Sequence, residues 1–88
     1  MALQQVLRAL GDPTRRQILE LLKAEPMTAT QIAERFPISA PAVSKHLAIL
    51  KEAELVRCRR NGNFLIYELC ASVLEEAIAW IMTLKEDT

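Results

Sequence analysis

The side chains with the clearest chemistry lie between Ser39 and His46, in the run Ser-Ala-Pro-Ala-Val-Ser-Lys-His. Serine and lysine donate hydrogen bonds to base edges or phosphates, and a histidine ring nitrogen donates or accepts according to its tautomer. Alanine and proline offer apolar contact to thymine methyl groups. These residue types predict contacts with the DNA major groove, and an ordinary solvated helix surface is the alternative. The candidate base contacts are Ser39, Ala40, Pro41, Ala42, Ser44, Lys45 and His46.

Basic residues outside this run are candidates for contacts with the DNA backbone. Such contacts neutralise phosphates and position a protein on DNA without specifying a sequence. The predicted basic residues are Arg15, Arg16, Lys51, Arg59 and Arg60. Asn61 and Asn63 accompany Arg59 and Arg60, and these four would reach the flanking backbone or the minor groove. Arg15 and Arg16 stand in a predicted first helical turn, where the helix dipole disfavours cations. We therefore expect an anion near them, either Asp12 or a phosphate, and a solvated arginine pair is the alternative.

A helix over residues 39–53 must carry the candidate base contacts. Ser39 is a suitable N-cap, and Pro41 is tolerated in the first turn because no amide is needed there. Val43, Leu47 and Leu50 recur at helical spacing and predict a buried face. The polar residues of the run fall mostly outside that face.

The preceding helix begins at a capping-box pattern, Thr-x-x-Gln, from Thr28 to Gln31. Ile32 and Phe36 predict its inner face, and Pro37 predicts its end. Only two or three residues then separate it from the next helix. So short a connection does not allow antiparallel packing, which predicts a helix-turn-helix unit.

Two further helices are predicted upstream. The leucine and valine spacing of Leu3–Leu10 predicts the first, and Gly11 ends it. Asp12 as N-cap and Pro13 at the first helical position predict the second. Pro26 prevents that helix from continuing.

A β-hairpin is predicted after the fourth helix. Asn61-Gly62 between two strand-like runs is a strong signal for a type I′ turn, because both central residues of that turn need positive φ. With these two residues at the centre of the turn, Cys58 pairs with Leu65 and the tip carries arginine and asparagine side chains.

The last helix is predicted to begin at a second capping box, Ser72-x-x-Glu75, and it is apolar around most of its circumference. A small domain covers only one side of such a helix. We therefore expect the other side, together with the first helix, to meet a second copy of the chain. The predicted dimer interface is Leu3, Val6, Leu7, Leu10, Val73, Leu74, Ala77, Ile78, Ile81, Met82 and Leu84.

Length and composition predict one domain over residues 1–88, with 51% apolar residues, more than a small monomer easily buries. The net charge is zero, but basic residues predominate between Ser39 and Asn63 and acidic ones from Glu68 to Thr88. Such segregation can steer a polyanion to one face. The N-terminus lacks a secretory pattern, and the longest apolar run, from Ala77 to Met82, has six residues. We expect a cytoplasmic protein without direct membrane insertion.

Catalysis and metal binding find little support in the sequence. The chain has one histidine, and adjacent Glu75 and Glu76 cannot face each other across a site, so we predict no enzyme and no cofactor. A zinc site needs three or four converging ligands, and none is predicted. Cys70 lies five residues beyond the predicted partner of Cys58. That separation of about 16 Å is too long for a disulfide within the chain. A redox role between subunits remains the alternative to two small buried hydrophobes.

Four helices, a hairpin and a final helix (ααααββα) predict a mainly α fold with a small β-hairpin, a winged helix-turn-helix. The sequence also resembles the ArsR family of small dimeric bacterial repressors over nearly its full length. The resemblance rests on LGDPTRRQIL at Leu10–Leu19, on Val-Ser-Lys-His-Leu within Ser39–Leu50, and on Leu55-Val56 leading into the hairpin. It is closest to short autorepressors that lack metal-binding extensions. Glu54 departs from the glycine that closes the recognition helix in many members, and a left-handed glutamate would be strained there.

The resemblance implies a homodimeric, sequence-specific DNA-binding repressor that acts on a palindromic operator. The helix at residues 39–53 would enter the major groove, and the wing at residues 57–67 would contact flanking DNA. Ser44, Lys45 and His46 are the base contacts that the resemblance favours most. Two alternatives remain: a protein-interaction module that docks a partner, and a repressor that responds to a metal or to redox state. A protein that sequesters the repressor is a further partner that the autorepressor type implies.

Overall fold

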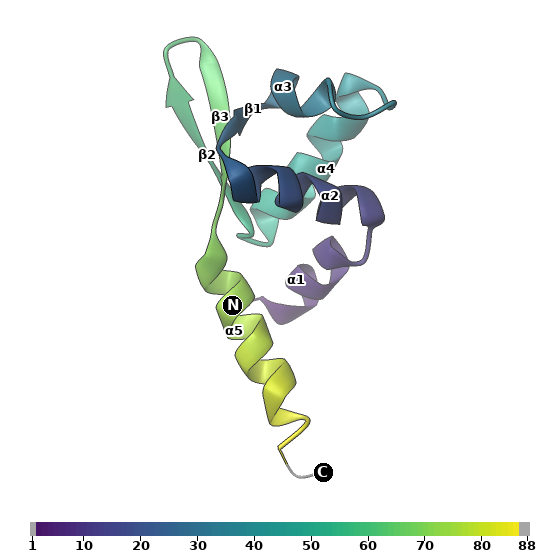
Figure 1. Ribbon diagram of the computed structural model, residues 1–88, viewed down its shortest axis with the longest axis vertical. Helices are drawn as coiled ribbons and strands as arrows, with labels where there is room; N and C mark the ends of the chain where they lie inside the picture. The colour runs from purple at the N-terminus through teal and green to yellow at the C-terminus, as the bar shows by residue number, and fades with distance from the viewer. Residues whose placement is uncertain (1, 87–88) are drawn as a thin grey trace.

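The computed structural model describes residues 2–86, which form a mainly helical fold with a three-stranded antiparallel sheet (Figure 1). In chain order the elements are α1 (Leu3–Leu10), α2 (Pro13–Ala24), β1 (Met27–Thr28), α3 (Ala29–Ala33), α4 (Ala40–Glu52), β2 (Val56–Asn61), β3 (Phe64–Leu69) and α5 (Ala71–Thr83). This order confirms the predicted winged helix-turn-helix and adds the strand β1. Met1, Asp87 and Thr88 lie outside the described residues, so the predicted 1–88 domain and its acidic end are described only as far as Glu86.

The start of α2 has the predicted geometry. Asp12 is extended, and its carboxylate accepts a hydrogen bond of 3.1 Å from the Arg15 backbone N–H. Pro13 occupies the first helical position, where its fixed φ suits the helix and its missing amide is not needed. Residues 11–13 therefore determine where α1 ends and α2 begins.

The helix-turn-helix unit begins at the predicted capping box. The Gln31 backbone N–H donates to Thr28 Oγ1 (3.1 Å), and the Thr28 N–H donates to Gln31 Oε1 (2.9 Å). The helix α3 ends at Ala33, earlier than the Phe36 and Pro37 boundary that the sequence predicted. At the start of α4, Ser39 is the N-cap as predicted, and its Oγ accepts from the Ala42 N–H at 3.2 Å.

The strand β1 was not predicted. It pairs antiparallel with β3, with Met27 opposite Tyr67 and Thr28 opposite Ile66, so that the sheet order is β1-β3-β2. Two residues are too few to show the alternation that marks a strand in a sequence. The pairing ties the hairpin to the start of the helix-turn-helix unit.

The predicted register of the hairpin was wrong by two residues. Cys58 pairs with Tyr67, and Asn61 pairs with Phe64, which leaves Gly62 and Asn63 as the two-residue loop. Gly62 has φ +63°, whereas neither asparagine has a positive φ. Positive φ at the first loop residue alone is the type II′ pattern, which replaces the predicted type I′ turn.

This register also shortens the predicted separation of the two cysteines. Cys70 lies three residues beyond the strand partner of Cys58, which is about 10 Å along an extended chain. Both thiols are free and half-buried.

The predicted capping box at the start of α5 was also wrong. The helix begins at Ala71, so Ser72 already lies inside its first turn, and Cys70 takes the N-cap position without a side-chain hydrogen bond. The reason is a backbone contact, because the Cys70 N–H donates to the Leu55 carbonyl at 2.9 Å. That bond fixes where the strand gives way to the helix.

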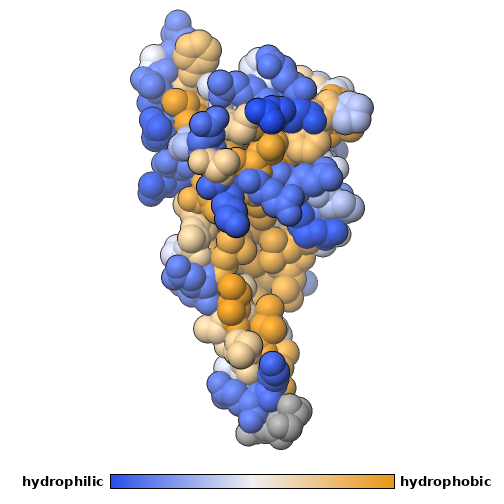
Figure 2. Space-filling view, viewed as in Figure 1, coloured by the Kyte–Doolittle hydropathy of each residue, from blue (hydrophilic) through white to orange (hydrophobic). Residues whose placement is uncertain are grey.

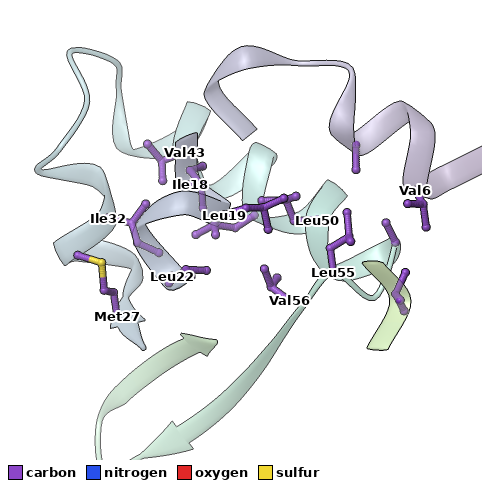
Figure 3. Close-up of a cluster of buried hydrophobic side chains, with 14 of the residues drawn as sticks. Val6, Ile18, Leu19, Leu22, Met27, Ile32, Val43, Leu50, Leu55 and Val56 are labelled. Carbon is purple, nitrogen blue, oxygen red and sulfur yellow. The ribbon is translucent and has the colours of Figure 1, made fainter. Parts of the chain in front are cut away.

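One apolar core joins all the helices (Figure 3). It contains the predicted stripe of α4, Val43, Leu47 and Leu50, each at most 1% exposed. Ile18 from α2 and Ile32 from α3 are fully buried beside it. Among the described residues, no polar or charged side chain is buried, and no helix is long and apolar enough to cross a membrane.

The end of α4 is closed by a Schellman motif with an unusual residue. The Leu55 N–H donates to Leu50 O and the Glu54 N–H donates to Lys51 O, both at 3.0 Å. Glu54 is left-handed, with φ +61°. Burial of Leu50 and Leu55 fixes this turn, which holds the glutamate in a conformation that costs an L-residue about 1–2 kcal/mol.

Replacing Glu54 with glycine should therefore stabilise the fold. We expect a gain of about 0.5–1 kcal/mol after allowing for the extra backbone freedom of glycine, or roughly 4 °C in Tm at fixed protein concentration. Thermal unfolding followed by circular dichroism measures it. Glu54→Ala is the matched control, because it removes the carboxylate but keeps the Cβ. An equal gain from alanine would assign the effect to charge and contradict the strain.

Candidate nucleic-acid interface

The helix α4 divides cleanly into a buried and an exposed face. The predicted base contacts all lie on its exposed side or at its first turn, outside the buried stripe. Ser39, Ala40, Pro41, Ser44 and Lys45 are exposed, and Ala42 and His46 are half-buried. In Figure 1, the start of α4 and the tip of the hairpin lie at one end of the molecule, and α1 and α5 lie at the other.

Arg15 connects three elements through its guanidinium. Its Nε donates to Ala9 O at 2.9 Å and its Nη2 donates to Arg8 O at 3.0 Å, both at the end of α1. Its Nη1 lies 3.2 Å from Nδ1 of His46 on α4. Each guanidinium nitrogen thus has a partner within the chain, and its role as a phosphate contact stays a prediction.

Arg16 caps the same helix end. Its Nη1 donates to Leu10 O at 2.7 Å, while the side chain remains exposed. The two arginines therefore donate to carbonyls in the last turn of α1, where the helix dipole favours cations. The sequence predicted an anion beside them, either Asp12 or a phosphate. The Asp12 carboxylate lies close enough for the charge of Arg15 to lower its pKa, and the end of α1 adds partial negative charge.

Asp12 lies beside this pair and stays charged. The hydrogen bond from the Arg15 backbone N–H, followed by the charge of Arg15, lowers the pKa of the Asp12 carboxyl below its usual value of 3.8, although partial desolvation opposes the shift. Its Oδ2 is 3.9 Å from Nδ1 of His46, which is too long for a hydrogen bond.

The hairpin presents its arginines on two faces. Arg57 and Arg59 share Glu68: their Nε atoms lie 2.7 and 3.7 Å from its Oε1. The contact with Glu68 raises the pKa of Arg57. Arg60 pairs with Leu65 on the opposite face and is exposed. Sequence reasoning did not include Arg57, although its alternation with Arg59 along one strand was visible.

Lys51 is not brought together with the other candidate residues of α4. It is exposed in the last turn, seven residues beyond Ser44, or about 10 Å along the helix. There it lines a hollow of about 390 Å³ with Arg57, Cys58 and Cys70.

Comparison with known proteins places the chain in a family. The profile described as "Helix-turn-helix domain" matches residues 10–59. The transcriptional repressor SdpR of Bacillus subtilis (strain 168) is 49% identical over 80 residues, which are 91% of this chain and 89% of that protein. An arsenical resistance operon repressor of Staphylococcus xylosus is 40% identical over 76% of this chain, which spans 64% of that protein. An ArsR-like transcriptional regulator from Rhodococcus sp. RHA1 superposes with a TM-score of 0.88 at 29% identity, covering 97% of this chain and 80% of that one. This chain belongs to the ArsR family of transcriptional regulators.

Family membership confirms the predicted resemblance and the prediction that the chain is not an enzyme. For metals, residues 2–86 contain no cluster of three or more His, Cys, Asp or Glu side chains that would hold an ion.

Cys58 lies beside Tyr67, and burial, followed by the nearby thiol, raises the pKa of the tyrosine. The cysteines of this ArsR-family chain are therefore two thiols at the edge of the core.

The predicted dimer interface divides into buried, half-buried and exposed residues. Val6, Val73 and Ala77 lie in the core of the single chain, because α5 packs its first turns on α1, so they add no exposed surface. Leu3, Leu10 and Leu74 are half-buried. Leu7, Ile78, Ile81, Met82 and Leu84 are exposed. The sequence analysis omitted Trp80, which is also exposed. In Figure 2 an apolar surface runs along the part of the molecule that α5 forms, and hydrophilic side chains lie at its tip.

The lowered pKa of Asp12 predicts a pH-dependent stability. Because the folded pKa lies below the unfolded one, the charged carboxylate stabilises the fold fully above about pH 4 and loses that effect as the pH falls through the folded pKa. Asp12→Asn keeps an N-cap oxygen but no charge. In urea unfolding, wild type should exceed this variant in stability above pH 4, and the difference should shrink below it.

Glu20→Gln is the control, since it removes an exposed carboxylate from the same helix. A difference between wild type and Asp12→Asn that persists unchanged to pH 2 would contradict the electrostatic origin.

Proposed function

We infer that this chain is a transcriptional repressor that binds double-stranded DNA as a homodimer in the cytoplasm. Residues 1–88 would act as one DNA-binding and dimerisation unit. The observation that carries the proposal is the division of α4, with its apolar stripe in the core and its Ser39–His46 surface turned outward. A helix held in this way can enter a major groove without disturbing the fold. The name of the SdpR relative supports repression.

The exposed apolar surface of α5 supports the homodimer. Ile78 and Leu84 are 59% and 63% exposed, and Ile81 and Met82 lie beside them. Burial of such side chains against a second copy is favourable by about 25 cal/mol per Å². Two-fold symmetry would then set two α4 helices into major grooves about 34 Å apart, which requires an operator with an imperfect palindrome.

The wing is assigned to DNA that flanks each recognition helix. Arg60, Asn61 and Arg59 would contact the DNA backbone. The ion pair of Arg59 with Glu68 would weaken the contact that Arg59 makes. Lys51, Arg15 and Arg16 are secondary candidates for phosphate contacts. A gel shift on a site selected from random DNA tests the proposal at about 150 mM salt, where specific binding exceeds non-specific binding by at least ~10³-fold. Equal binding to the selected site and to random DNA would refute it.

A second candidate function rests on the same apolar surface. An interaction module would use α5 to dock a different protein, and the net charge of zero is compatible with this role. A sequestering partner would combine both functions. Sedimentation separates them, because the repressor forms a dimer alone and shifts with DNA, whereas the module does neither.

Loss of the reading side chains should remove sequence preference without dissociating the dimer. For Lys45→Ala combined with His46→Ala, we expect specific binding to fall to the level of random DNA, because each base contact contributes about 1–3 kcal/mol of discrimination. Competition gel shifts measure this and sedimentation checks the dimer. A monomeric double variant would show that the faces of α4 are assigned wrongly.

Arg59→Ala with Arg60→Ala is the contrasting variant. It should weaken binding to every sequence alike and reduce the salt slope of log K by at most about 1.8, since each phosphate contact contributes about 0.9. Arg60→Ala alone should account for the larger part, because Glu68 already neutralises part of Arg59.

Ile81→Glu should convert the dimer to a monomer by burying a charge in the apolar seam. Sedimentation equilibrium measures the loss of mass. Ala79→Glu is the matched control: it introduces the same charge at an exposed position of the same helix, roughly 160° around the helix from Ile81. Equal effects of the two variants would contradict the assigned interface.

A further inference from the structure

We propose that Arg15 is a positioning residue that fixes His46 as a hydrogen-bond donor toward DNA, so that each operator half-site carries a base-edge acceptor opposite His46. This inference rests on the proposed DNA-binding function. It concerns the proton on the imidazole, which decides whether a histidine reads an acceptor or a donor.

The contact between the two side chains allows one assignment of the ring proton. Nη1 of Arg15 lies 3.2 Å from Nδ1 of His46. A guanidinium nitrogen has hydrogens to donate and no acceptor, so Nδ1 must supply a lone pair. In the neutral ring the proton therefore sits on Nε2. The competing arrangement, with Nδ1–H donating to Asp12, would span 3.9 Å and is too long.

Nε2 lies on the edge of the ring away from Arg15 and is open to solvent. Nε2 has no hydrogen-bond partner among residues 2–86. Every buried side-chain nitrogen in these residues has a partner, so Nε2 is not buried. The His46 side chain is 22% exposed, next to the exposed Lys45. The ring thus presents one N–H from the reading helix.

Arg15 is held firmly enough to impose this geometry. Its Nε and Nη2 donate to Ala9 O and Arg8 O, which leaves Nη1 directed at His46. An N–H donor matches purine N7, guanine O6 or thymine O4 in the major groove, and it does not match the amino groups of adenine or cytosine. His46 should accordingly select bases that offer an acceptor.

The single histidine makes the tautomer directly measurable in the full chain. Long-range ¹H–¹⁵N correlation spectra at a pH where the ring is neutral should show Nδ1 unprotonated and Nε2 protonated in the wild type. Arg15→Met should shift the Nδ1 resonance toward that of an unbonded, exchanging ring. Arg15→Lys keeps a side chain that can donate a hydrogen bond but not accept one, so it should restore part of the wild-type signal.

Arg16→Met is the matched control for structural effects. Arg16 donates to a carbonyl of the same end of α1 but makes no contact with His46. Its loss should leave the imidazole resonances in place. A protonated Nδ1 in the wild type, or equal shifts in the two methionine variants, would overturn the proposal.

Selection from random DNA tests the consequence for recognition. Arg15→Met should lose preference at the same base positions as His46→Ala, by roughly fivefold, the usual value of one hydrogen bond. The double variant should lose no more than either single one. Arg16→Met removes only a candidate phosphate contact, so it should select the same sequence as the wild type even where its overall affinity falls.

The outcomes separate this inference from the proposed function. An even loss of affinity for all sequences in His46→Ala would assign His46 to a phosphate and overturn the base-edge assignment. A wild-type site recovered unchanged by Arg15→Met would overturn the positioning role, while the repressor function would stand. No enriched sequence with the wild type would refute the repressor function itself.

Discussion

Burial of one face of α4 is the constraint on which the rest of the molecule depends. Val43, Leu47 and Leu50 fix the rotation of this helix about its axis, since turning it would expose the stripe and bury Ser44 or Lys45. The elements α1, α2, α3 and β2 pack directly on α4. The Schellman turn at Glu54 joins α4 to β2 through only three residues, 53–55.

A polar connection works beside this apolar one. Arg15 and Arg16 donate to carbonyls at the end of α1, and Arg15 also contacts His46. The end of the molecule that carries the apolar surface is thus joined to the reading helix by direct hydrogen bonds as well as through the core. Helix ends usually find capping groups nearby in sequence, and here two arginines of the next helix provide them.

Local signals explain what the sequence could predict. Caps at Asp12, Thr28 and Ser39 and the apolar spacing of α4 act within a few residues, so they are readable without a fold. The strand β1, the hairpin register and the start of α5 depend on partners distant in the chain. Within the candidate site, the outward surface of α4 followed from periodicity. The engagement of Arg15 with His46, 31 residues away, did not.

Leu55 fixes how three elements of the molecule are placed relative to one another. Its N–H closes α4, its carbonyl receives the Cys70 N–H that starts α5, and its side chain is fully buried, so three elements are anchored at one residue. In a dimer formed through α5, the distance between the two recognition helices would therefore vary little. One inserted base pair shifts a half-site by about 3.4 Å and turns it by roughly 35°. Such a protein would discriminate between operators by the spacing of their half-sites as strictly as by the bases in them.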